Sequence, residues 1–300
     1  MSKSFNYTYG TIKTWRWNGD NLSFFDNASL DVNSDYIDEA KKIIDKNGVD
    51  MIRISPYHGF KKGSLDFILD VKKLRGIHIY RSANVDISAI EKRTDLEYLR
   101  IAENKQRIDL SHLSNLLLLT IDWHKKIKLP LPDNSRLEFL LLGSFSEKTL
   151  LSLPCYTQLA WLSICGGSIV SLDGLERFKN LRIYEHRLGK KLHDISKLVE
   201  LPNLKELELN LCKNIEIEDI FERCKKLKIL KYLGCADLPS LAFIKKMKRI
   251  EDFRFGGTNI LDGDLTPLLQ LKDFGFYPNK RHYSHTYEKL KQIHAEERND

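Results

Sequence analysis

One short pattern of leucine-like residues recurs along most of this 300-residue chain. Its clearest copy is Leu201–Cys212, with the letters LPNLKELELNLC, in which Leu204, Leu207 and Leu209 hold the spacing LxxLxL. Ten copies begin 20 to 23 residues apart, at Leu74, Leu96, Leu116, Leu137, Leu159, Leu181, Leu204, Leu227, Ile250 and Leu271. A looser copy starts at Val49. Chance apolar spacing drifts over so many copies, so the pattern predicts a chain of repeated structural units.

The alternation of apolar and polar residues inside each copy predicts a short β-strand. Leu207 and Leu209 are expected to point to one face of a sheet, while Glu206 and Glu208 point to the other. One strand of this length cannot bury its own leucines. Parallel strands from successive copies would share a continuous core, so the sequence predicts a stack of parallel strands.

The residues between the strands must return the chain to the start of the next copy. In Asp86–Ile90 and in Asp194–Leu201, apolar residues recur at every third position. This spacing is typical of a short helix or a 3₁₀ turn. We therefore expect short helical segments on the side of the core opposite the strands.

These features resemble the leucine-rich repeat family, whose consensus is LxxLxLxxN/CxL with a period of about 20–29 residues. The resemblance covers residues 49–280, and the recurrent D-I-S-x-[LI] wording looks like the short-repeat class common in bacteria. It implies an α/β fold, namely a leucine-rich repeat solenoid shaped as a curved horseshoe. A parallel β-sheet would line the concave face, short helices or 3₁₀ turns would form the convex face, and both ends would be capped.

The eighth residue after the leading leucine of each copy is mostly small and polar, or cysteine. It holds Ser82, Asn104, His124, Phe145, Gly167, Gly189, Cys212, Cys235, Thr258 and Asn279. In the family this side chain turns inward and bonds the backbone of the neighbouring turn, which is polar and needs partners. Phe145, Gly167 and Gly189 are consecutive exceptions. We expect this ladder to be interrupted there, or to be replaced by backbone or by Ser144 and Ser146.

The two ends of the chain depart from the repeat. Residues 1–48 are expected to form an N-terminal cap, with a hairpin of Thr11–Trp17 and Leu22–Phe25 followed by a helix at Tyr36–Lys46. A separate functional domain is the alternative for this segment. Residues 49–276 would be the array of ten to eleven repeats. Residues 277–300 would form a C-terminal cap with a short helix at Tyr287–Glu297.

The composition limits the cellular compartments in which we expect the protein and the kinds of partner that it could bind. The longest apolar run, near Leu116–Leu119, is far shorter than the roughly 20 residues of a membrane span, and the N-terminus lacks the apolar core of a signal peptide. The five cysteines form no CxxC pair, and we interpret Cys212 and Cys235 as structural thiols. We expect a cytoplasmic protein without a membrane partner. The net charge of +7 slightly favours an acidic partner.

The sequence contains none of the common catalytic templates, so we expect a non-enzymatic protein with no cofactor. His282, His285 and His294 are close enough in sequence to suggest a metal site, but capping hydrogen bonds are the favoured interpretation. His186 occupies a core-leucine position and is expected to be buried and hydrogen-bonded.

The strand positions that face away from the core are the candidate partner-binding residues. They are Tyr80, Tyr98, Arg100, Leu118, Asp122, Phe139, Leu141, Trp161, Ile183, Glu185, Glu206 and Glu208. The five apolar residues from Leu118 to Ile183 are expected to form one exposed patch, which is typical of an interaction site. The alternatives are that rim loops cover these residues, or that the register is shifted by one residue.

The predicted function is a module that binds a protein partner of unknown identity on the concave face. An immunity or antitoxin-like inhibitor of a toxin is one hypothesis, and a regulatory scaffold for an endogenous partner is another. Nucleic-acid binding is a further alternative. The side chains that could contact phosphates are Arg53, Arg81, Arg100 and Arg187, and those that could stack on bases are Tyr80, Tyr98 and Trp161. Acidic residues on the same face oppose it, because phosphate binding needs a continuous basic stripe.

Overall fold

The computed structural model describes residues 9–18, 21–47, 49–61, 63–80, 85–133, 135–217 and 219–298. The chain divides into two compact units, Met1–Glu138 and Phe139–Asp300, which are described separately below. This division falls inside the repeat array, whereas the sequence placed its boundaries at the caps. Of the predicted ladder positions, Ser82 lies outside the described residues.

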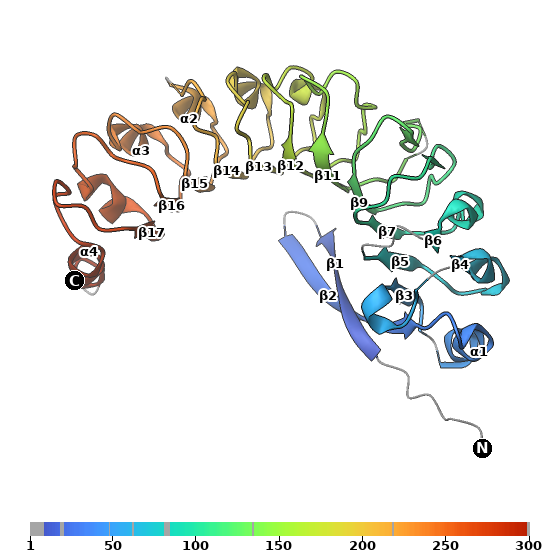
Figure 1. Cartoon of the computed structure of the whole chain (residues 1–300). Coiled ribbons are helices and arrows are strands. Elements are labelled where there is room, and N and C mark those ends of the chain that lie inside the picture. The colour runs from blue at the N-terminus through green and yellow to red at the C-terminus, as the bar shows by residue number, and fades with distance from the viewer. Residues whose placement is uncertain are drawn as a thin grey trace. The chain divides into compact units, whose positions relative to one another are not determined.

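The first unit contains a hairpin followed by parallel strands (Figure 1). Strand β1 (Tyr9–Asn18) pairs antiparallel with β2 (Asn21–Val32), so the predicted hairpin strands lie inside these two elements. The parallel strands that continue from β2 are β3 (Met51–Ile54), β5 (Gly76–Ile79), β7 (Tyr98–Ile101) and β9 (Leu118–Asp122).

Helix α1 and short returning segments accompany these strands. Helix α1 spans Ile37–Asn47. The 3₁₀ helices are η1 (Pro56–His58), η2 (Asp66–Asp70) and η3 (Ser88–Lys92). Two small parallel pairs join the returning segments of successive repeats, namely β4 (Gly63–Ser64) with β6 (Val85–Asp86) and β8 (Ile108–Asp109) with β10 (Ile127–Lys128).

The second unit is a parallel sheet in which each strand pairs with the next strand in sequence. Its strands are β11 (Phe139–Phe145), β12 (Trp161–Gly167), β13 (Ile183–Arg187), β14 (Glu206–Asn210), β15 (Ile229–Leu233), β16 (Asp252–Gly256) and β17 (Asp273–Tyr277). The returning segments contain η4 (Leu175–Arg177), η5 (Ser196–Glu200), η6 (Thr266–Gln270), α2 (Ile220–Arg223) and α3 (Ala242–Lys246), and α4 (Tyr287–Glu296) follows the last strand. Within this unit the strands lie on the inner side of an arc and the helices on its outer side (Figure 1).

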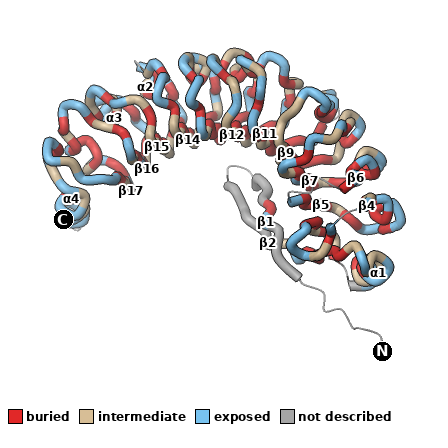
Figure 2. Tube along the Cα trace, viewed as in Figure 1, coloured by how far each residue is buried: buried red, intermediate tan, exposed pale blue. Residues whose placement is uncertain are grey.

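The core of each unit lies between the strands and the returning segments (Figure 2). In the second unit, Leu207 pairs in register with Tyr184 on one side and with Leu230 on the other, and all three are buried. In the first unit, Ile77 and Leu99 pair in the same way. The inward positions of successive repeats therefore stack into one layer, which confirms the predicted stack of parallel strands.

The returning segments begin with a local turn that the sequence pattern anticipates. A carboxylate oxygen of Asp86 accepts a hydrogen bond from the Ser88 backbone N–H at 2.9 Å, and Asp194 accepts one from Ser196 at 2.8 Å. These side chains take up backbone donors that would otherwise lack partners at the start of η3 and η5. The predicted short helical turns are confirmed at both places.

The inward ladder is built by side chains in the later repeats. The Cys235 thiol donates to the carbonyl of Leu209, with 3.3 Å between sulfur and oxygen. The Thr258 hydroxyl accepts from the Cys235 N–H at 3.0 Å and donates to the Cys235 carbonyl at 3.2 Å. Cys212 makes a longer contact of 3.7 Å to the carbonyl of His186. These thiols are structural, as predicted.

Backbone replaces the ladder where the sequence breaks it. Strands β11 and β12 extend as far as Phe145 and Gly167, which pair directly. The Ser168 N–H donates to the Phe145 carbonyl at 2.8 Å. A Cβ atom on Gly167 would lie 2.1 Å from that carbonyl oxygen, so the close approach requires glycine. The expectation of an interrupted ladder with backbone substitution is confirmed.

Several histidines bond backbone carbonyls beside the last repeat. The ring of His282 contacts the Ile260 carbonyl at 2.9 Å, and that of His294 contacts the Leu271 carbonyl at 2.7 Å. The His285 ring contacts the Ser284 hydroxyl at 3.0 Å. These contacts agree with the capping interpretation. Within the described ranges, no helix combines the length and the apolar character needed to cross a membrane.

His186 supplies a test of the core. It is 2% exposed and its Nδ1 lies 2.9 Å from the Tyr184 hydroxyl, as expected for a buried, bonded histidine. Burial lowers its pKa from 6.5 to about 4. The unfolded chain therefore binds more protons between these values, and stability falls as the pH drops from 6.5 towards 4.

We expect His186→Leu to remove most of this acid sensitivity, which corresponds to roughly 3 kcal/mol of unfolding free energy. Urea denaturation at several pH values between 4 and 7 measures it. His112→Leu, at an exposed histidine, is the control and should keep the wild-type slope. An unchanged slope in the His186 variant would contradict the assignment.

Candidate functional site

The outward positions of β11–β17 form three rows across the second unit, and we call this surface the strand face. The first row is Phe139, Trp161, Ile183, Glu206, Ile229, Asp252 and Asp273. The second is Leu141, Ser163, Glu185, Glu208, Lys231, Arg254 and Gly275. The third is Gly143, Cys165, Arg187, Asn210, Leu233, Gly256 and Tyr277. Because the pairing keeps strict register, the predicted candidates between Phe139 and Glu208 all lie on this one surface.

The apolar end of the strand face is less exposed than predicted. Phe139 and Ile183 are only 7% and 4% exposed, so their assignment to an exposed patch was wrong. Trp161 lies between them in the first row, and its ring meets that of Phe139 edge to face, with 5.1 Å between centroids. The indole thus packs directly against Phe139. Trp161 and Leu141 are half-buried and carry the accessible apolar surface here.

Beside this apolar end, Arg187 links two glutamates of neighbouring strands. Its guanidinium lies 3.1 Å from the Glu185 carboxylate and 2.8 Å from that of Glu208. Lys231 lies 3.9 Å from Glu208 on the next strand. The sequence listed the glutamates as partner contacts but missed that Arg187 holds both of them. The sequence did contain a sign of this arrangement, because Glu185 and Glu208 occupy equivalent positions of successive repeats and Arg187 lies two residues after Glu185.

A second charged group lies at the far end of the face. Arg254 is 2.9 Å from the Asp252 carboxylate and 2.6 Å from that of Asp273. Asp273 also receives Lys291 of α4 at 2.5 Å. Three of these four side chains come from the strand face and the fourth comes from the last helix. The charges at this end are thus satisfied within the protein.

Glu206 differs from every other charged residue in the three rows of the strand face, because its carboxylate has no ion pair and no hydrogen bond with the residues that the structure describes. It is half-buried, with Ile183 and Ile229 in register on either side. Burial raises the pKa of its carboxyl, while the charge of Lys231 opposes that rise. A half-buried carboxylate with no direct partner is unusual, because burial without pairing costs free energy.

The first unit holds the remaining predicted residues, which are distributed differently. Tyr98 is 5% exposed and packs with Met51 and Leu117, and Leu118 lies against this cluster. The prediction that Tyr98 contacts a partner assumed an exposed ring, and that assumption was wrong. The Arg75 guanidinium lies 5.7 Å from the centre of the same ring, so local contacts already use it.

Three further candidates lie at the outer positions of β5, β7 and β9 or just after them. Tyr80 is partly exposed and stacks on His78 with 3.8 Å between ring centres. Burial, together with the nearby charges of Arg100 and Arg53, lowers the pKa of His78 to about 3. Arg100 is exposed, and the Asp122 carboxylate accepts a hydrogen bond from the Glu103 N–H at 2.7 Å. Arg53, considered above for phosphate contacts, instead pairs with Asp31 at 2.5 Å.

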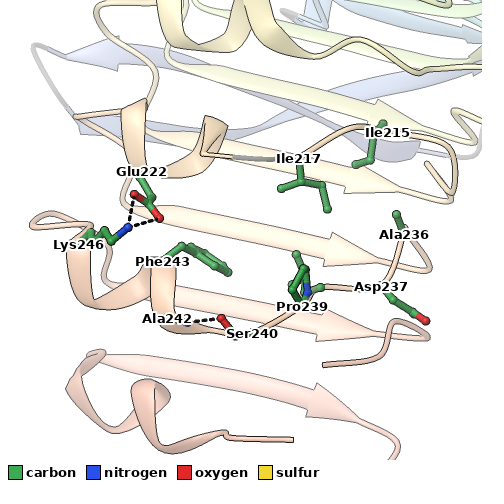
Figure 3. Close-up of a pocket in the computed structure, with 11 residues that line it drawn as sticks. Ile215, Ile217, Glu222, Ala236, Asp237, Pro239, Ser240, Ala242, Phe243 and Lys246 are labelled. Atoms are coloured by element: carbon green, nitrogen blue, oxygen red, sulfur yellow. Dashed lines mark hydrogen bonds and ion pairs between the residues drawn. The ribbon is translucent and has the colours of Figure 1, made fainter. Parts of the chain in front are cut away.

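A groove that the sequence did not indicate lies between α2 and α3 on the outer side of the second unit (Figure 3). Its volume is about 470 Å³. Ile217 and Phe243 supply apolar surface, and the ion pair of Glu222 with Lys246, at 3.0 Å, closes one end. The residues that line this groove lie on the returning segments of adjacent repeats. No sequence motif predicts how two such segments are placed relative to each other. In the ranges that the structure describes, no cluster of three or more His, Cys, Asp or Glu side chains is arranged to hold a metal ion.

Comparison with known proteins gives structural neighbours only. No family model matches the sequence, and no curated protein matches it. Internalin InlF of Listeria monocytogenes superposes with a TM-score of 0.52 at 12% identity, over 85% of this chain and 94% of that one. The TLR13 chain in the TLR13–ssRNA13 complex gives 0.50 at 15% identity, over 78% of this chain and 37% of that one.

The fold is that of a leucine-rich repeat protein. The stacked parallel strands, the short returning helices and these neighbours agree on it. The α/β solenoid predicted from the repeats of this leucine-rich repeat chain is thereby confirmed. At these identities the likeness concerns the fold, so the functional argument must come from the chain's own residues.

The raised pKa of Glu185 yields a testable prediction about the strand face. Burial raises it above the ordinary value of 4.5, and Arg187 only partly opposes the shift. The folded protein therefore binds this proton more tightly than the unfolded chain does. The Glu185 contribution to stability must then increase as the pH falls through the folded-state pKa towards 4.5.

We expect wild type to gain unfolding free energy relative to Glu185→Gln as the pH falls from 7 to 4. Paired denaturation curves at each pH measure this difference. Glu39→Gln changes an exposed glutamate of α1 and should show no comparable gain. A difference that shrinks towards acid would contradict the burial argument.

Proposed function

We propose that this leucine-rich repeat protein is a binding module that holds a protein partner on the strand face of its second unit. The observation that carries the proposal is the half-buried pair of Trp161 and Leu141, next to the ion-paired group of Arg187. An aromatic anchor with apolar surface and a charged surround is the composition that dominates protein interfaces. The strands beneath it are paired in register in one parallel sheet, which preorganises the surface.

Trp161 and Leu141 are the preferred anchors because of their exposure. Phe139 and Ile183 support Trp161 from both sides and are themselves almost covered. A partner side chain that docks on the indole would bury the remaining apolar surface without rearranging the strands.

Nucleic acid is the second candidate, because one structural neighbour was solved in a complex with single-stranded RNA. The charges on the strand face oppose it. The basic groups Arg187 and Arg254 are both engaged by carboxylates, so neither is free to neutralise a phosphate. Acidic side chains between them would repel a nucleic-acid backbone.

We propose two alternative roles for this protein once it has bound its partner. In the first, it is an immunity or antitoxin-like protein that inhibits a toxin. In the second, it is a regulatory scaffold for an endogenous partner in the cytoplasm. Tight one-to-one inhibition with rescue of growth on co-expression would support the first. Several weaker endogenous partners would support the second.

The site is tested with a Leu141→Glu/Trp161→Glu double variant in a quantitative pull-down from the source cell's lysate, supplemented with any candidate toxin. We expect loss of a partner that wild type captures, by tenfold or more, because buried aromatic anchors contribute about 2 kcal/mol or more. Leu151→Glu is the matched control, since Leu151 is exposed on the returning segment of the same repeat.

Circular dichroism and thermal melting should first show that the double variant folds. A partner retained equally by wild type and by the folded double variant would contradict the proposed site. A partner lost only with Leu151→Glu would transfer binding to the outer surface.

A further inference from the structure

The position of Glu206 on the strand face indicates which kind of charged group a partner protein would place there. The seven other charged residues in the three rows each have an opposite charge within 4 Å. Glu206 alone among these described residues lacks one. Among the described residues, Glu206 is therefore the one strand-face carboxylate without an ion pair, and it lies on β14, the strand that also carries Glu208 of the Arg187 group.

The surroundings of Glu206 favour a particular kind of ligand group. Ile183 and Ile229 flank it on the neighbouring strands, and Trp161 lies one strand beyond Ile183 in the same row. Adjacent strands are about 4.8 Å apart, so Trp161 is roughly 10 Å from Glu206 along the row. A long side chain with an apolar stem and a cationic end could lie along this row, with its stem on isoleucine and its charge at the carboxylate.

We propose that Glu206 receives an arginine or lysine of the partner protein, and that an apolar partner residue beside that cation docks on Trp161 and Leu141. This inference rests on the proposed function and adds the charge and the composition of the partner segment. The cation would give Glu206 the ion pair that it lacks among the described residues. Arginine suits the site best, since its planar guanidinium binds a carboxylate through two hydrogen bonds.

Electrostatics support this choice of occupant. Burial raises the pKa of Glu206 in the free protein, and the negative charges of Glu185 and Asp252 add to that rise, while the charge of Lys231 only partly opposes it. A partner cation would relieve both effects, and the surrounding apolar side chains would strengthen the attraction by excluding water. An acidic partner segment would face repulsion at the same point. The overall charge of +7 therefore misleads about this surface, whose one unpaired charge is negative.

The test uses a displayed library of random twelve-residue peptides selected on the full chain. We expect the selected peptides to be enriched in arginine or lysine next to an aromatic or aliphatic residue. Representative peptides should bind Glu206→Gln at least tenfold more weakly than wild type in fluorescence anisotropy. Their affinity for wild type should also fall with added salt more steeply than their affinity for the variant.

Two control variants separate the possible results. Glu216→Gln removes an exposed carboxylate from the returning segment of the same repeat and should leave binding unchanged. Glu206→Lys, selected against the same library, should favour aspartate or glutamate in the peptides. Glu206→Gln removes an unpaired, partly buried charge, so we expect it to fold at least as stably as wild type.

The outcomes distinguish this inference from the proposed function. Peptides that need Trp161 and Leu141 but show no basic enrichment, and bind Glu206→Gln as well as wild type, would overturn the inference and leave the site intact. Peptides that bind the Leu141→Glu/Trp161→Glu variant as tightly as wild type would overturn both the inference and the proposed function. Failure to enrich any basic peptide would also count against the inference.

Discussion

The structure depends on the inability of one short strand to bury its own leucines. Each repeat contributes two inward residues, such as Leu207 and Leu209, and these become buried only between the equivalent residues of the repeats before and after. The parallel register is the consequence, because a shift by one residue would bring Glu208 into the core. The same constraint fixes every outward position and so creates the three rows of the strand face.

Polar groups are accommodated at the two places where the backbone bends. Aspartate side chains such as Asp194 begin the returning segments, and thiols or hydroxyls such as Cys235 and Thr258 bond the backbone after the strands. Where Gly167 replaces such a residue, the neighbouring backbones approach and bond directly. The fold thus tolerates different chemistry at one position if the carbonyls find a donor.

The strand face gains its character from how its side chains neutralise one another. Arg187 forms ion pairs with two glutamates and Arg254 forms ion pairs with two aspartates. Most charged side chains of the strand face are therefore paired with one another. What remains for a partner is a half-buried tryptophan with a leucine beside it and one carboxylate, Glu206. A surface with these groups selects its partner by position and charge, whereas the net charge of the chain describes only long-range attraction.

The sequence by itself determined the repeat, the register and the face on which each strand residue lies, because these follow from local spacing that is repeated ten times. It also determined that His186 is a core residue and that the ladder changes at Gly167. Only the tertiary structure decided which outward residues are accessible. Phe139, Ile183 and Tyr98 are buried, and Glu206 has no ion pair among the described residues; Phe139 packs against Trp161 and Tyr98 packs against Met51, which belong to other repeats. Exposure and charge pairing depend on the sizes and rotamers of those neighbours, which no periodic pattern specifies.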